Sequence, residues 1–80
     1  MDAIIYCNTD DRQSAVMQDY LRGLSVGCRL RHIDNGDPGA RREFEELGGS
    51  GVPLVVLGEG QVVHGFDRTR INQILGWIGC

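Results

Sequence analysis

The chain has 80 residues, a length that fits one small domain over residues 1–80 and leaves no room for a second. Its formal net charge of −3 argues against a general nucleic-acid binder. The first residues lack the basic and apolar regions of a secretory signal, and no apolar run approaches the roughly 18 residues that span a membrane. Three cysteines with no close pair do not form a disulfide framework. We therefore expect a cytoplasmic protein with no nucleic-acid partner and no membrane partner.

The first half of the chain alternates strand and helix patterns. The apolar residues 3–7 predict a buried strand. Asp10 and Gln13 have the spacing of a capping box, which predicts a helix from residue 11 to about residue 24. Residues 28–33 alternate polar and apolar side chains, as in a half-exposed strand at the edge of a sheet. The predicted apolar face of the helix carries Val16, Met17, Tyr20, Leu21 and Leu24.

A second helix follows a turn in the middle of the chain. Asp37 is its predicted N-cap and Pro38 its predicted first residue, and two glycines at positions 48 and 49 end it. Its charged residues are most simply interpreted as a solvated face: Arg41, Arg42, Glu43, Glu45 and Glu46.

The last third of the chain predicts two strands and a helix. The apolar residues 54–57 predict a strand covered on both faces, and residues 61–64 follow closely enough to pair with it as a hairpin. Asp67 is the predicted N-cap of a third helix, whose apolar face carries Ile71, Ile74, Leu75 and Ile78. The order β-α-β-α-β-β-α predicts an α/β fold in which a mixed four-stranded sheet is flanked by three helices.

Three short segments stand in an order and at a spacing that resemble a known family. Ile4-Ile5-Tyr6 is similar to the first strand of the glutaredoxin family, within the thioredoxin superfamily. Gly51-Val52-Pro53, followed by Leu54-Val55-Val56, is similar to its cis-proline loop and third strand, and Val63-His64-Gly65-Phe66-Asp67 to the turn before its last helix. The run from His64, with Ile71-Asn72 after it, particularly resembles the small redoxins that deliver electrons to ribonucleotide reductase. The resemblance covers nearly the whole chain and implies a thioredoxin-like fold of glutaredoxin type with a cis Val52–Pro53 bond.

The chain departs from the family at the active site. The family has Cys-x-x-Cys at a helix N-terminus, where the dipole lowers the pKa of the first thiol and the second thiol resolves the mixed disulfide. Asp11-Arg12-Gln13-Ser14 stands at that spacing here, so a carboxylate replaces the nucleophile and a hydroxyl replaces the resolving thiol. No catalytic residue is therefore predicted in the two motif positions, Asp11 and Ser14. Cys7 is the alternative thiol, although it is more simply interpreted as a small, partly buried residue at the end of the first strand.

The resemblance also implies where a partner would bind. The Val52 backbone would pair with an extended peptide beside Pro53, and the residues 65–67 would complete the site: Gly65, Phe66 and Asp67. A protein partner or an extended peptide is the expected ligand of this loop. No cofactor is required, and glutathione is the candidate small ligand, although His64 replaces a glycine that is usual in glutathione binders. His32 and His64 have no Cys or carboxylate at metal-ligand spacing, so no metal site is predicted.

Three classes of function follow from these residues. The first, which we favour, is a glutaredoxin-like domain that has lost dithiol chemistry and acts as a binding or interaction module. The second is a residual single-thiol or glutathione-linked activity through Cys7. The third is an enzyme of different chemistry using Asp11 and His64, for which the sequence has no supporting constellation.

Overall fold

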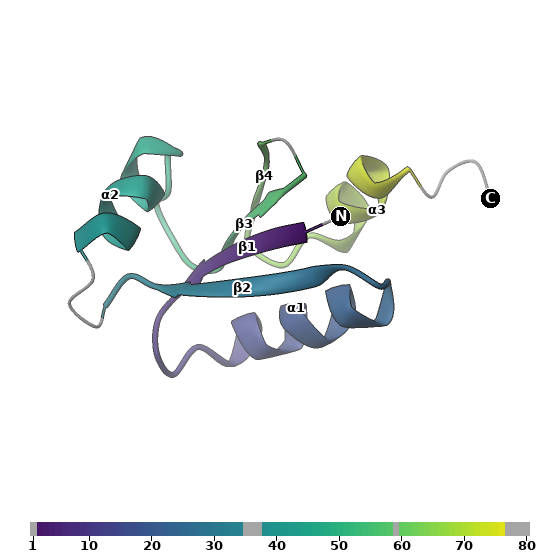
Figure 1. Cartoon of the computed structure of the whole chain (residues 1–80), viewed down its shortest axis with the longest axis horizontal. Helices are drawn as coiled ribbons and strands as arrows, with labels where there is room; N and C mark the ends of the chain where they lie inside the picture. Colours follow the sequence, from purple (N-terminus) through teal and green to yellow (C-terminus); the bar gives the residue numbers. More distant parts are fainter. Residues whose placement is uncertain (1, 35–37, 59, 77–80) are drawn as a thin grey trace.

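The computed structural model describes residues 2–34, 38–58 and 60–76. Within them the elements follow the predicted order and the predicted α/β fold class is confirmed (Figure 1). The elements are β1 (Asp2–Cys7), α1 (Arg12–Gly23), β2 (Gly27–His32), α2 (Pro38–Glu46), β3 (Leu54–Leu57), β4 (Gln61–His64) and α3 (Arg68–Leu75).

The strands form one mixed sheet in the order β2-β1-β3-β4. β1 is parallel to β2 and antiparallel to β3, and β3 is antiparallel to β4. Because parallel neighbours need a crossover, α1 connects β1 to β2, whereas a short hairpin connects β3 to β4. β2 lies at one edge, so the predicted edge strand is confirmed, with Arg29 and Arg31 on the same face.

One face of the sheet is closed by α1 and α3. Side chains alternate along each strand, and on this face those of β1 and β3 are almost completely buried, whereas Leu30 of the edge strand β2 is 36 % exposed. Met17 and Leu21 of α1 and Ile71 of α3 have exposed fractions of 0 %, so both helices seal this side. The resulting core comprises Ala3, Ile5, Cys7, Met17, Leu21, Val26, Val55, Leu57, Val63 and Ile71.

The other face carries α2 and a smaller core. Phe44 of α2 packs with Tyr6 and Leu54, and the two aromatic ring centres are 6.5 Å apart. The Phe44 ring also lies over Gly49, where an added Cβ would come within 2.5 Å of a ring carbon. A glycine at this position therefore allows the chain to leave α2 and pass close under the ring.

Two local predictions for α1 are wrong. Asp11, and not Asp10, is the N-cap, because its extended backbone and accepting carboxylate precede the first helical residue, Arg12. Val16 was predicted on the apolar face, but 53 % of it is exposed, since the helix turns its Ser14, Met17 and Leu21 side toward the sheet. Asp37 and Ile78, the other predicted cap and core residues, lie outside the described residues.

No helix in the part of the chain that the structure describes is long and apolar enough to cross a membrane.

Candidate functional site

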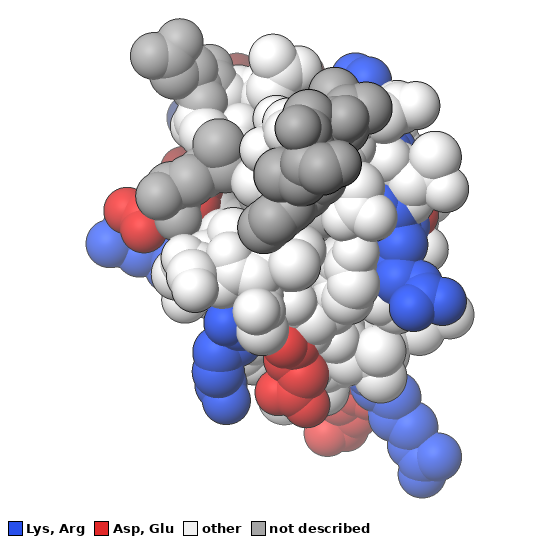
Figure 2. Space-filling model, turned by 90° about the vertical axis from the view of Figure 1, so that its right-hand side faces the viewer, with Lys and Arg blue, Asp and Glu red and all other residues white. Residues whose placement is uncertain are grey.

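The loops that carry the candidate site meet at one end of the sheet. β1 and β2 both finish there, and the connection from α2 enters β3 there (Figure 1). Tyr6 pairs with Leu54, so the next residues, Cys7 and Pro53, are neighbours just past the last pair. The Val52–Pro53 peptide bond is cis. Figure 2 shows the opposite end, where acidic and basic side chains are interspersed around uncharged ones.

The cis-proline loop is joined to the turn before α3. The Gly65 N–H donates a hydrogen bond of 2.9 Å to the Pro53 carbonyl. Gly65 has φ +73°, a left-handed conformation in which most side chains would be strained. This bond brings together the two segments, 52–53 and 65–67, that the family resemblance assigned to ligand binding.

Asp11 acts as the N-cap of α1. Its Oδ1 accepts hydrogen bonds from the backbone N–H groups of Gln13 at 3.0 Å and Ser14 at 3.3 Å. A carboxylate here accepts hydrogen bonds from the first backbone N–H groups of the helix, which have no partner within the helix, and it lies at the positive end of the helix dipole. Its Oδ2 is buried and has no hydrogen-bond partner within the described residues. The sequence prediction that Asp11 stands at the start of this helix is confirmed. Its role there is structural, because it caps the helix.

Ser14 and Cys7 lie against each other beneath the start of α1. Ser14 is only 3 % exposed, and its hydroxyl has no well-formed hydrogen bond to a described residue. Burial raises the pKa of the Cys7 thiol above its ordinary value; the adjacent Ser14 hydroxyl lowers this pKa, and the charges of Asp11 and Asp34 raise it. Cys7 is 1 % exposed, so its sulfur is both poorly ionised and poorly accessible.

Exposed hydrogen bonds between Thr9 and Asp34, here called the Thr9–Asp34 latch, hold the loop between β1 and α1. The Thr9 N–H lies 3.0 and 3.1 Å from the two Asp34 carboxylate oxygens, and the Thr9 hydroxyl donates at 2.9 Å. Hydrogen bonds from Thr9 hold the pKa of Asp34 below its usual range. The latch fixes the approach to Asp11 by connecting it to the chain that leaves β2, a contact that the sequence did not reveal.

Phe66 and Asp67 occupy the start of α3 in different roles. Asp67 is the confirmed N-cap, and its carboxylate accepts from the Arg70 N–H at 3.0 Å. Phe66 meets Tyr20 of α1 edge-on, with ring centres 5.6 Å apart. The Arg68 guanidinium lies 5.9 Å from the Tyr20 ring centre and 6.0 Å from that of Phe66, within cation–π range. Sequence reasoning assigned Tyr20 only to the core and missed Arg68.

The Val52 backbone is available for pairing. Neither its N–H nor its carbonyl makes a hydrogen bond to residues 2–34, 38–58 or 60–76. Val52 precedes the cis-proline and is half-buried, so its peptide groups form a short, unpaired edge beside the ends of β1 and β3. Unpaired backbone groups of this kind can bind an extended segment by strand addition.

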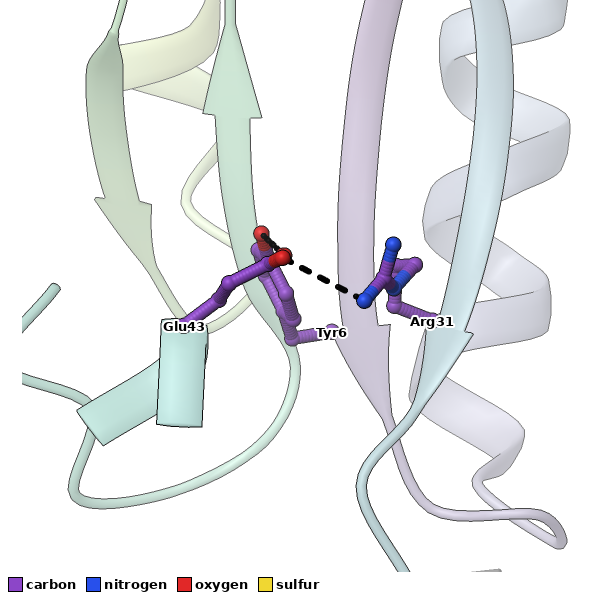
Figure 3. Close-up of polar contacts among 3 residues, drawn as sticks. All are labelled: Tyr6, Arg31 and Glu43. Carbon is purple, nitrogen blue, oxygen red and sulfur yellow. Dashed lines mark hydrogen bonds and ion pairs between the residues drawn. The ribbon is translucent and has the colours of Figure 1, made fainter. Parts of the chain in front are cut away.

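A second polar group lies on the α2 face of the sheet (Figure 3). Tyr6 is 3 % exposed, and its hydroxyl donates to Glu43 Oε1 at 2.8 Å. The other Glu43 oxygen meets the Arg31 guanidinium at 3.3 Å. Burial, the hydrogen bond from Tyr6 and the charge of Glu43 together raise the pKa of Tyr6 to about 12, although Arg31 opposes them.

This contact corrects the interpretation of Glu43 as part of a solvated helix face. Glu43 is partly buried and joins α2 to β1 and β2 at once. The pairing of Tyr6 with Arg31 in the β1–β2 register was the only available signal, and it required knowledge of that register.

The chemistry that the site can perform is limited by these positions. Neither Asp11 nor Ser14 can exchange disulfides, and Cys7 is the one thiol beside them among the described residues. No group of three or more His, Cys, Asp and Glu side chains within the described ranges is placed to hold a metal ion. The arrangement provides a capped helix start, an open backbone edge and a buried thiol.

Comparison with known proteins identifies the fold. No family model and no curated protein matches the chain. Among solved structures, it resembles a variant of the thioredoxin-like protein BC3987, with a TM-score of 0.79 and 24 % identity over 92 % of this chain and 94 % of that one. The glutaredoxin-like NrdH-redoxin of Escherichia coli gives a TM-score of 0.75 and 22 % identity over 92 % and 95 % of the two chains.

An archaeal protein gives the same picture. The glutaredoxin of Methanosarcina mazei has a TM-score of 0.77 and 18 % identity, over 95 % of this chain and 82 % of that one. The likeness extends over nearly the whole of this chain and most of each relative, and it includes the mixed sheet and the three helices described above. The chain therefore has a thioredoxin-like α/β fold, similar to the folds of these glutaredoxin-like proteins.

Proposed function

We propose that this chain is a redoxin-type module that binds an extended peptide segment of a partner protein at its cis-proline loop, without dithiol–disulfide exchange. The observation that carries the proposal is the start of α1, where Asp11 and Ser14 occupy the spacing of the family's cysteine pair. Since thiol–disulfide exchange needs a nucleophilic thiolate and a resolving thiol, this site lacks both reactants.

The binding role rests on the Val52 edge. An incoming strand would exchange hydrogen bonds with the free Val52 N–H and carbonyl, and Gly65 and Phe66 would border it. Glutathione, a short peptide, is the small ligand to test at the same edge, and no cofactor is needed for the proposed role. We place this activity in the cytoplasm, with no nucleic-acid or membrane partner.

Residual single-thiol activity through Cys7 is the competing function, and burial of this thiol disfavours it. The discriminating assay measures reduction of insulin and of a small glutathione mixed disulfide. We expect both rates to equal the rate in buffer. Turnover that disappears in Cys7→Ser would contradict the proposal and establish the single-thiol function.

Binding at the Val52 edge can be measured separately by NMR titration. The probes are reduced glutathione and a five-residue acetylated Val/Ser peptide, with the same peptide N-methylated at alternate residues as the control. We expect the unmethylated peptide to shift the Val52 and Gly65 amide signals and the methylated one to lose this effect, because it lacks the donors for pairing. Equal shifts from the two peptides would rule out backbone pairing.

A further inference from the structure

A cavity lies on the face of the sheet opposite to α1 and α3. Its volume is about 230 Å³, and it opens between α2 and strands β1 and β3. Its lining consists of Ile4, Tyr6, Glu43, Glu46, Leu47 and Val56. Cys7 and Val55, the neighbours of Tyr6 and Val56 along the strands, face the closed core, so this cavity is separated by the sheet from the thiol of the candidate site.

Ile4 and Val56 form the floor of the cavity and belong to an apolar row that α2 leaves open. Ile4, Val56 and Val62 are directly paired across β1, β3 and β4 and lie on the same face. The neighbouring row, with Tyr6 and Leu54, is covered by Phe44. Ile4, Val56 and Val62 remain half-buried, so apolar surface that a second helix would normally seal is accessible beside α2.

The wall of the cavity is acidic where physical chemistry favours a cation. The last turn of α2 contains Glu43, Glu45 and Glu46 and has no basic residue. A helix C-terminus carries a partial negative charge, so these carboxylates lie in an unfavourable position unless cations neutralise them. A local choice that conflicts with a general rule in this way often marks a functional surface.

Two of the three carboxylates have cations within the chain. Arg31 meets Glu43 at 3.3 Å, and Arg41 meets Glu45 at 3.5 Å. Glu46 forms no ion pair with any residue in the ranges the structure describes. Its carboxylate borders the cavity, so the apolar floor is adjacent to a negative charge that no described residue pairs.

We propose that this cavity binds a segment of a partner protein that presents an aliphatic side chain next to an Arg or Lys. The aliphatic group would cover Ile4, Leu47 and Val56, and the cation would reach Glu46 at the end of α2. Val52 does not line this cavity, so occupation of the cavity does not require occupation of the Val52 edge.

The test uses three matched peptide probes: acetyl-Leu-Arg-Leu-amide, acetyl-Leu-Gln-Leu-amide and acetyl-Leu-Glu-Leu-amide. Methyl NMR spectra of the full chain report contact at Ile4, Leu47 and Val56, and the Val52 methyls report the other site. We expect the arginine peptide to shift the first three and to bind roughly two- to fivefold more tightly than the glutamine peptide, the range given by one exposed ion pair. The glutamate peptide should bind least.

Two variants assign the charge preference to Glu46. Glu46→Gln should abolish the preference for arginine over glutamine, and Glu46→Lys should reverse the order of the arginine and glutamate peptides. Glu45→Gln is the matched control, since it removes the same charge from the same turn but from the side chain that Arg41 already pairs. Equal affinity of the three peptides for the unmodified protein, or shifts confined to Val52, would overturn the proposal.

Discussion

The two faces of the sheet differ in how completely their side chains are buried. The α1 and α3 side has ten buried residues in one core, and the six strand residues among them have exposed fractions of 1 % or less. The α2 side has three buried residues, a polar contact between Tyr6, Glu43 and Arg31, and a row of half-buried aliphatic side chains. The same strands therefore supply a closed face and a partly open face.

This difference separates stability from recognition in a domain that is small. Since a chain of about this size buries only some 60 % of its unfolded surface, it has little apolar area to leave uncovered. The closed face supplies most of the hydrophobic stabilisation, so the open face and the loop end of the sheet are where binding surfaces can be placed at least cost to folding.

The largest expected effect compares neighbouring valines of β3 that point to opposite faces. Val55→Ala should destabilise the protein by about 1–3 kcal/mol, because two carbon atoms are removed from a fully packed site. Val56→Ala should cost less than about 1 kcal/mol, since this side chain is half-buried and water can occupy its place. Urea unfolding measures both, and strand propensity cancels in the difference. Equal losses would show that the two faces are equally packed.

The next prediction concerns the helix that seals the closed face. Asp11→Ala removes the N-cap of α1 and should cost about 0.5–2 kcal/mol of unfolding free energy. Asp11→Asn is the control, because an asparagine side chain keeps the capping hydrogen bonds and loses only the charge next to the helix dipole, worth about 0.3–1 kcal/mol. An alanine variant as stable as the native chain would mean that Asp11 is retained for a reason other than capping.

The third prediction concerns the polar contact on the open face. Tyr6→Phe should cost about 0.5–1.5 kcal/mol, since it deletes one hydrogen bond to Glu43 and leaves the ring in place. A cost below that of Val55→Ala would show that the open face depends less on a single contact than the closed face does.

The same variant makes the pH dependence testable. The folded pKa of Tyr6, about 12, is above the ordinary value of 10.0. The neutral phenol is therefore favoured in the folded state, and this contribution is fully present below about pH 10 and is lost as the pH rises to 12. Between these values the native protein should lose stability faster than Tyr6→Phe. Parallel stability curves for the two proteins would contradict the raised pKa.

Local patterns predicted the order of the elements because each depends on neighbours in the chain. The apolar run at 54–57, the Asp67 cap and the start of α2 at Pro38 were correctly placed. The capping box at Asp10 was wrong because Asp10 and Asp11 offer similar chemistry, and only the backbone geometry selects between them. Val16 was wrong because the helix rotates to bury Ser14, which shares a face with Met17 and Leu21 but has a polar side chain that suggests an exposed position.

The contacts of the candidate site depend on residues that are far apart in sequence. Two examples are the hydrogen bonds of Tyr6 with Glu43 and of Thr9 with Asp34, whose partners are 37 and 25 positions apart. No local pattern connects such pairs before the sheet order is known. The resemblance to redoxins located Asp11, Ser14 and Pro53, but it could not show that Ser14 lies against Cys7.

The central proposal is that positions 11 and 14 correspond to the two active-site cysteines of redoxins. The contact between Ser14 and Cys7 determines how this proposal is tested. Asp11→Cys with Ser14→Cys restores the family spacing within one turn of α1, and the helix dipole should lower the pKa of the first thiol below about 8.5. Because Cys7 could compete for a cysteine at position 14, the measurement is made in a Cys7→Ala background, with Ser14→Cys alone as the control for pairing with Cys7.

The measurement is peptide mapping by mass spectrometry after oxidation in air, combined with insulin reduction using dithiothreitol as the electron source. We predict a folded protein with a disulfide between positions 11 and 14 and a gain of reductase activity over the unmodified chain. A folded variant whose two introduced thiols stay unpaired would contradict the account, because it would show that the start of α1 is not the redoxin active-site position.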